Sequence, residues 1–287
     1  MINTAMPCEG MYVQGRRLAA LAALVFVLLA FAPQAAWADE AAEMQKKLQN
    51  PLANISAVMT YNTIGFDTGS TGDTSYTFQV QPVYAIDFPN AGFTMIPRGI
   101  IPIMGLEPGT DVPIVGQPSG TSSTWGLGDT MVQLYFAPHT ESSWKWGVGP
   151  QISIPTATKT QLEGPQWGTG VAGVLVGNFT EKLAFTGIVG NHWGNSGKFN
   201  ALILQPLLFY TIAPGKSLAY VGTISADWET SSSNRWTVPI GLSWNQTIDL
   251  GGGYGFDYMI GPYYNVARPD GAASWQIIFG ISWLIPK

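Results

Sequence analysis

The stretch SWQIIFGISWLI at residues 274–285 alternates bulky apolar side chains with small or polar ones. A period of two places the two sets on opposite faces of a β-strand. The bulky face holds Trp275, Ile277, Phe279, Ile281, Trp283 and Ile285, and the other face holds Ser274, Gln276, Gly280 and Ser282. Because that second face is polar with few charges, the pattern is typical of a barrel wall that has lipid outside and water inside.

Similar alternation continues through the chain from about residue 55 to its end. We expect an all-β fold, a closed antiparallel transmembrane β-barrel of about 12 strands with a short N-terminal helix, because bacterial single-chain barrels have an even number of strands. Each segment is near the length that crosses a bilayer when tilted. The expected strands are 55–65, 74–88, 92–104, 125–138, 144–156, 167–178, 181–193, 199–213, 217–228, 234–247, 255–266 and 273–285.

Composition agrees with a membrane barrel. Charged residues make up 11% of the 287 residues and the net charge is -5. A soluble all-β protein usually carries more Lys and Glu on its exposed face. The acidic balance and the lack of a basic run argue against a nucleic-acid partner.

The first 38 residues are typical of a secretory signal peptide. Arg16 and Arg17 precede an apolar run over 18–31, and the small residues around 36–38 predict cleavage before Asp39. The alternative, a membrane-anchoring helix, would need a run of about 20 residues.

Three parts are therefore expected: a signal peptide at 1–38, a short helix and linker at 39–54, and an outer-membrane β-barrel at 55–287. The single cysteine, Cys8, precedes the cleavage site, so the mature chain would hold no disulfide and no thiol site. Acidic residues open the helix, Lys46 and Lys47 close it, and Asn50 and Pro51 stop it. Whether this helix is a periplasmic tail or a plug at the barrel mouth stays open here.

Loop lengths predict an orientation. Short turns at 89–91, 178–180 and 214–216 alternate with longer connections such as 105–124, as periplasmic turns alternate with extracellular loops. Tryptophans cluster near both sets of strand ends, where indole rings prefer the headgroup level. The expected membrane-interface girdle is Trp125, Trp167, Trp193, Trp228, Trp236 and Trp275 on the loop side and Trp144, Trp146, Trp244 and Trp283 on the turn side.

Prolines inside the expected strands oppose a regular ladder, since each lacks an N–H. We expect bulges or bends at several of them. They are Pro82, Pro97, Pro102, Pro150, Pro155, Pro206, Pro239 and Pro262.

Several segments, in this order along the chain, resemble one family of bacterial outer-membrane transporters. That family is grouped with the meta-pathway phenol-degradation outer-membrane proteins and often carries the label "neuromedin U". The resemblance implies an outer-membrane barrel and a transport role; it brings no established substrate and no site residues, and its phenol-pathway association suggests aromatic or other hydrophobic compounds as cargo. The segments are KKLQNPLANI (46–55), QPVY (81–84), PRGIIPI (97–103), GLGDT (126–130), WGVGPQISIPTAT (146–158), GNHW (190–193), LQPLLFYT (204–211), RWTVPIGL (235–242) and WLIPK (283–287).

If bulky apolar residues face lipid, strand parity assigns the polar positions to the lumen. These side chains form either a solute-binding or selectivity site, or a structural network that fills a narrow barrel. Arg98 and Asp129 fall on neighbouring strands but near different ends, so a direct pair is left open. The predicted lining is Gln79, Gln81, Arg98, Asp129, Gln133, Gln151, Gln205, Asp227, Arg235 and Gln276.

Catalysis, cofactors and metals find little support. His139 and His192 are the only histidines, and His192 lies near Ser196, which superficially suggests a nucleophile and its base. That loop reads more simply as a Gly/Asn turn. The chain shows no GxSxG motif, phosphate loop or metal-ligand cluster, so we expect no enzyme activity, no cofactor and no metal.

The expected function is passage of small solutes, aromatic or hydrophobic compounds among them, across the outer membrane. The alternatives are a non-conducting structural or adhesive barrel and a lipid hydrolase at the rim. Expected partners are outer-membrane lipid and lipopolysaccharide, a small-molecule solute and, during biogenesis, the barrel-assembly machinery.

Overall fold

The computed structural model describes residues 38–110 and 122–286. The chain divides into two units, and the strands belong to the second, Asp39–Lys287. The predicted signal peptide and Cys8 lie outside the described residues. Within 38–110 and 122–286, no helix combines the length and the apolar character needed to cross a membrane.

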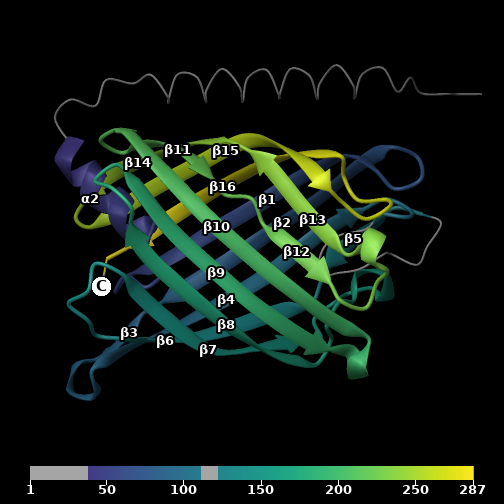
Figure 1. Cartoon of the computed structure of the whole chain (residues 1–287), viewed down its shortest axis with the longest axis horizontal. Coiled ribbons are helices and arrows are strands. Elements are labelled where there is room, and N and C mark those ends of the chain that lie inside the picture. The colour runs from purple at the N-terminus through teal and green to yellow at the C-terminus, as the bar shows by residue number, and fades with distance from the viewer. Residues whose placement is uncertain (1–37, 111–121, 287) are drawn as a thin grey trace, which may run out of the picture. The chain divides into compact units, whose positions relative to one another are not determined.

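Strands form almost the whole of the described unit (Figure 1). Their antiparallel pairings link sixteen strand segments of residues 38–110 and 122–286 into one sheet. The segments are β1 (Ser56–Thr68), β2 (Asp73–Tyr84), β3 (Ile86–Phe88), β4 (Phe93–Leu106), β5 (Thr124–Leu127), β6 (Thr130–Pro138), β7 (Lys145–Ile154), β8 (Gly168–Asn178), β9 (Leu183–Gly194), β10 (Phe199–Ala213), β11 (Lys216–Tyr220), β12 (Ile224–Asp227), β13 (Trp236–Gly241), β14 (Ser243–Gly251), β15 (Tyr254–Ala267) and β16 (Trp275–Ile285).

Four barrel strands are interrupted, and each appears as two segments. β2 and β3 both pair with β4, and so do β5 and β6. Likewise β11 and β12 both pair with β10, and β13 and β14 with β15. Counting each interrupted strand once leaves twelve, and the pairing of β1 with β16 closes the ring. The predicted twelve-stranded closed antiparallel barrel is confirmed.

The last strand, β16, shows how side chains divide between the two faces. Trp275, Ile281 and Trp283 are more than two-fifths exposed on the outer face. The inner face also carries Ile278 and Leu284, which are almost fully buried. Other side chains inside the ring cover these two residues. The barrel interior is therefore partly apolar.

Prolines mark some of the irregularities in the ladder, as expected. The register shifts by one residue between Val238 and Pro239, which is a bulge. The break between β5 and β6 lies opposite Pro102, whose carbonyl accepts from the N–H of Gly128 at 3.0 Å. Leu242, which separates β13 from β14, lies opposite Pro262.

Other prolines leave the pairing register intact. The register continues through Pro82, Pro97, Pro150 and Pro206, while Pro155 falls just beyond the end of β7. The gap between β11 and β12, residues 221–223, lies opposite Pro206. Pro102, Pro206 and Pro262 each lie opposite a break in one neighbouring strand. Pairing with the other neighbouring strand continues through each of them.

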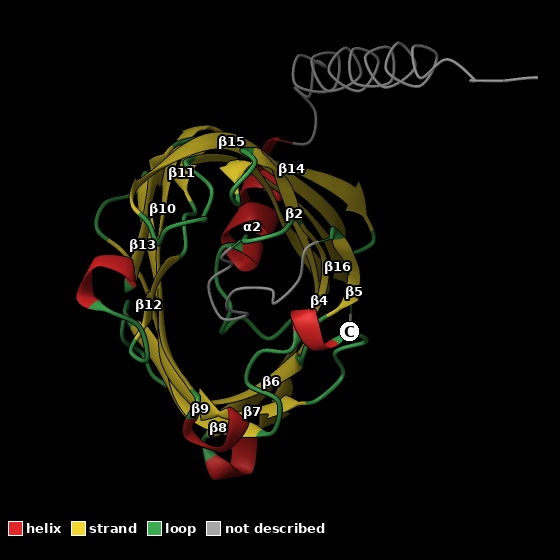
Figure 2. Ribbon diagram, turned by 90° about the vertical axis from the view of Figure 1, so that its right-hand side faces the viewer, coloured by secondary structure: helices red, strands yellow, loops and turns green. Residues whose placement is uncertain are grey.

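The helix α2 (Ala38–Leu48) lies inside the ring of strands (Figure 2). Met44 is buried against Ala57 and Leu284. Beyond the helix, Leu52 packs into a cluster from β2 to β9, and Thr186 donates to the Gln49 carbonyl at 2.8 Å. Of the two alternatives left open by the sequence, the structure shows the plug.

The plug occupies the end of the barrel with the short turns. A Cβ at Gly215, in the β10–β11 turn, would stand 3.1 Å from Ala41, and one at Gly255, where β15 begins, would stand 2.6 Å from Met44. The long 155–167 connection and the last residue of β4, Leu106, lie at the opposite ends of the strands. We call these two ends the turn side and the loop side.

Candidate functional site

Two cavities in the described part of the lumen adjoin each other and share part of their walls. The loop-side chamber has a volume of about 190 Å³ and reaches Leu162 and Pro165 of the long connections. The helix-side chamber has a volume of about 130 Å³ and reaches Leu48 and Pro51. Five residues line both chambers, and we call them the neck: Tyr61, Gln81, Arg98, Ile188 and Gln205.

Arg98 forms one side of the neck. It lies on the inward face of β4, between β2 and β6. Its Nη2 donates to Gln81 Oε1 at 2.6 Å and its Nη1 donates to Gln133 Oε1 at 3.3 Å. The alternation of β4 places this side chain inward between two other inward residues, Ile96 and Ile100.

The amides extend this network around the wall. Gln133 Nε2 donates to Gln151 Oε1 at 2.9 Å, and Gln151 Nε2 donates to the Asn191 carbonyl at 3.0 Å. The Tyr135 hydroxyl also donates to Gln133 Oε1 at 3.0 Å. The chain of amides runs from β2 to β9 and holds the guanidinium in one place.

The other side of the neck is built on the gap at 221–223. The Tyr61 hydroxyl donates to the Val221 carbonyl at 3.1 Å. Gln205 Nε2 donates to Thr223 Oγ1 at 2.8 Å, and Thr223 Oγ1 contacts the Tyr61 hydroxyl at 3.4 Å. Because β11 and β12 are interrupted here, backbone and hydroxyl groups are free to bond side chains in the lumen.

Among the described residues, no counter-charge pairs with Arg98 in the neck. Arg98 is only 8% exposed, its Nε has no hydrogen-bond partner, and its acceptors are neutral amides. Within residues 38–110 and 122–286, His139 and Asp87 form an ion pair, and no carboxylate pairs with Arg98. A buried guanidinium without a carboxylate is energetically unfavourable, so its presence in a lumen is a sign of function.

Asp129, which lines the loop-side chamber, also bonds the 155–167 connection. Its Oδ2 accepts from the backbone N–H groups of Gly164 at 2.9 Å and Gln166 at 2.7 Å, and its Oδ1 accepts from Ala157 at 3.2 Å. Asp129 therefore folds the 155–167 connection back over the barrel. It precedes Gln133 by four residues, or about 13 Å along a strand, and it does not pair with Arg98.

The structure brings most of the predicted lumen residues together. Asp227 and Arg235 line neither chamber. Asp227 is the last residue of β12, where it pairs with Ala201, whereas Arg235 lies just before β13, so strand parity does not direct the Arg235 side chain. The eight predicted residues that line the loop-side chamber are Gln79, Gln81, Arg98, Asp129, Gln133, Gln151, Gln205 and Gln276.

Asp227 and Arg235 make contacts within the connection between β12 and β13. Asp227 Oδ1 accepts from the Glu229 N–H at 2.9 Å. Arg235 Nη2 donates to the Thr230 carbonyl at 3.3 Å, and its guanidinium lies 5.5 Å from the centre of the Trp228 ring. For these two residues the lumen lining stays a prediction.

The sequence did not predict two neck residues, Tyr61 and Ile188, or Thr223, which bonds the neck residue Gln205. Tyr61 and Ile188 point inward, whereas the parity rule predicts that bulky residues face outward. Thr223 lies in the gap, where no strand pattern exists. One signal was available in the sequence. Tyr61 lies two residues from both Met59 and Thr63, so strand parity places these three side chains on the same face.

His192 is built into the wall of the loop-side chamber. Its Nε2 lies 3.0 Å from Ser153 Oγ, and the Ser153 hydroxyl donates to the Gln166 carbonyl at 2.6 Å. The imidazole must therefore donate to the serine, which is the reverse of base activation. His192 Nδ1 has no hydrogen-bond partner, so the suggested pairing with Ser196 is not formed.

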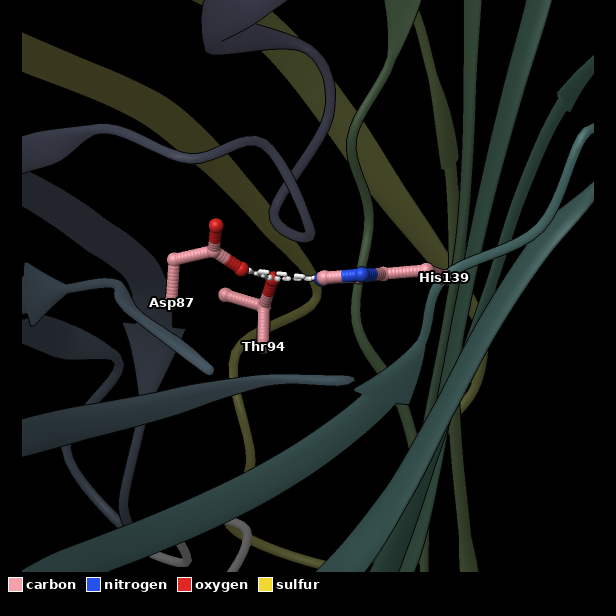
Figure 3. A network of polar contacts seen from close by, with 3 residues as sticks. All are labelled: Asp87, Thr94 and His139. Atoms are coloured by element: carbon pink, nitrogen blue, oxygen red, sulfur yellow. Dashed lines mark hydrogen bonds and ion pairs between the residues drawn. The ribbon is translucent and has the colours of Figure 1, made fainter. Parts of the chain in front are cut away.

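His139 joins the other polar cluster, on the turn side (Figure 3). Its Nε2 lies 2.8 Å from Asp87 Oδ1 and 3.3 Å from Thr94 Oγ1, and Thr94 Oγ1 donates to Asp87 Oδ1 at 2.9 Å. A catalytic triad places the acid and the hydroxyl on opposite ring nitrogens. Here both contact the same nitrogen, so the arrangement differs from a triad. The cluster connects Thr94, near the start of β4, with Asp87 of β3 and with His139, which follows β6.

The expected girdle tryptophans lie mostly on the outside. Trp144 and Trp244 are half-buried. The tryptophans with more than a third of their surface exposed are Trp125, Trp146, Trp167, Trp193, Trp228, Trp236, Trp275 and Trp283.

No protein-family model matches the chain, and no curated protein matches it. Among solved structures it is similar to an outer membrane channel from Pseudomonas putida F1, with a TM-score of 0.57 and 15% identity, over 81% of this chain and 96% of that one. It is also similar to the NanC porin, with a TM-score of 0.48 and 12% identity, over 81% of this chain and 100% of that one. At these identities the likeness concerns the fold.

Proposed function

We propose that this barrel lies in the outer membrane and passes small solutes through its lumen. The observation that carries the proposal is an apolar, exposed outer wall around a chambered interior with a polar neck. Val171, Val189, Ile240 and Tyr264, for example, are each close to half exposed or more. A soluble protein rarely exposes so continuous an apolar surface, whereas lipid accommodates it.

The solute class follows from the wall of the loop-side chamber. Ile100, Met131 and Ile203 line it together with glutamine amides. Such a surface suits compact solutes that carry both an apolar body and a polar group. The resemblance to the phenol-degradation group supports the same class.

The plug sets the conductance expected of the resting barrel. α2 and the residues after it occupy the turn side, and Met44 is 5% exposed. We expect little passage of hydrophilic ions unless this segment moves. A solute must displace it or move past it.

Proteoliposomes containing the purified protein test the proposal. Uptake of a labelled aromatic compound is expected to exceed that of empty liposomes. Met44→Asp should raise conductance in planar bilayers, because a buried carboxylate facing Ala57 and Leu284 costs several kcal/mol and loosens the plug.

A surface variant provides the control. Glu43→Gln lies on the exposed part of the same helix and should leave uptake unchanged. A correctly folded barrel, checked by its gel mobility before and after heating, that shows no uptake in either form would contradict the channel and favour a structural barrel.

A further inference from the structure

The guanidinium of Arg98 is fixed in the neck but not neutralised. Arginine offers five N–H donors in a plane, and a carboxylate matches two of them at once. Two hydrogen bonds to amide oxygens hold the group in position, and those oxygens bring no charge. The side chain borders both chambers, so what remains exposed of it faces the lumen.

The acids that line the chambers are already engaged. Asp129 accepts three backbone N–H groups of the 155–167 connection. Asp257, in the helix-side chamber, accepts from Asn245 Nδ2 at 2.8 Å and from Thr247 Oγ1 at 2.6 Å. Neither acid forms an ion pair with Arg98, so the guanidinium charge stays available to an anionic solute within low-dielectric walls.

Apolar groups surround this charge. Ile188 belongs to the neck, and Ile100 follows Arg98 by two residues on the same face of β4. A solute bound here would place an anionic head on the guanidinium and a compact apolar body against these side chains. This geometry differs from that of a general anion pore, where the walls are polar throughout.

We propose that Arg98 is a carboxylate-binding site in the neck, and that the solutes of this barrel are small organic acids with an apolar body. This deepens the proposed function and rests on the same lumen. Gln81 and Gln133 act as positioning residues, because they orient the guanidinium through neutral oxygens and leave its charge available.

Binding of 4-fluorobenzoate and of its neutral counterpart 4-fluorobenzamide to the protein in detergent tests this, with fluorine NMR line broadening as the readout. The benzoate is expected to bind at least about tenfold more tightly, since charge-assisted bidentate hydrogen bonds are the stronger kind. Equal binding of the two probes, or binding of neither, would overturn the proposal.

Gln81→Glu is the sharpest variant. It keeps the shape of the side chain and places a carboxylate on the 2.6 Å contact with Arg98. The internal ion pair should compete with the solute, and benzoate affinity should fall at least about tenfold while the barrel stays folded. Arg235→Gln, an arginine that lines neither chamber, is the matched control and should change nothing.

Liposome uptake separates this proposal from the broader one. Uptake of the amide and the acid at equal rates would leave a channel without a carboxylate site. Tight benzoate binding that Gln81→Glu abolishes, without any uptake, would leave the site and remove the channel. Unchanged benzoate affinity in Gln81→Glu would contradict the carboxylate-binding site, whatever the uptake assay shows.

Discussion

Two acid–arginine sets come from the same alternating pattern and have different roles. Arg98 and Asp129 are each less than a tenth exposed and engage named partners inside the barrel. Asp227 and Arg235 flank the short β12–β13 pairing, where only two residue pairs connect the strands. Their contacts are with backbone groups of their own connection and with the exposed ring of Trp228.

This difference shows where strand parity can predict the direction of a side chain. Parity fixes the direction of a side chain because hydrogen bonds to both neighbouring strands hold the backbone in its pleat. Arg98 has ladders on both sides, and Arg235 lies beyond the end of the ladder. The same residue type at a formally inward position is therefore buried in one case and lies at the rim in the other.

The largest contrast should appear between the two aspartates. Asp129→Ala leaves three backbone N–H groups without their acceptor, which should favour opening of the 155–167 connection by about 3 kcal/mol, or about a hundredfold. Asp227→Ala removes one exposed contact and should change stability by under about 1 kcal/mol. Hydrogen exchange over 155–167, measured by mass spectrometry, checks both.

Asp129→Asn is the matched control for that experiment. It keeps one acceptor oxygen and removes the charge, so its effect should fall between those of the other two variants. If Asp129→Ala leaves the exchange of the Gly164 and Gln166 amides unchanged, the carboxylate does not hold the connection.

A smaller effect is expected on ion preference. Arg98→Glu reverses the only uncompensated charge found at the neck among the described residues, so the ratio of anion to cation permeability should fall about tenfold. Arg235→Glu should leave the ratio near its original value. Reversal potentials in a KCl gradient measure it, with Met44→Asp as background if the resting barrel conducts too little. Equal shifts of the reversal potential in the two variants would mean that the neck arginine and the rim arginine affect ion preference equally.

Much of the fold could be predicted because it depends on a local, repeated property. Alternation found all twelve strands, and the predicted 255–266 and 273–285 nearly coincide with β15 and β16. The interruptions could not be predicted in the same way. The break at Leu242 comes from Pro262 on the neighbouring strand, and such a cross-strand effect has no mark at the broken position itself.

The site was harder to predict than the wall. Parity found Arg98 and the glutamines, whose polarity excludes them from lipid. It missed Tyr61 and Ile188, since a narrow lumen with a helix inside accepts apolar groups that the rule assigns to lipid. The gap at 221–223, which supplies the Val221 carbonyl and the Thr223 hydroxyl, depends on tertiary pairing that no single strand encodes.

The smallest predicted effect concerns the rim contact itself. A double-mutant cycle of Arg235→Gln and Trp228→Leu should give a coupling of about 0.5–1 kcal/mol, typical of an exposed cation–π contact. The cycle of Arg98→Gln and Gln81→Leu should give about 1.5–3 kcal/mol, because a charged hydrogen bond is buried there. Urea unfolding of the folded barrel in lipid vesicles measures both cycles. A rim coupling as large as that of the neck would mean that burial does not separate the two arginines, and that the pleat alone cannot explain why only one of them borders the lumen.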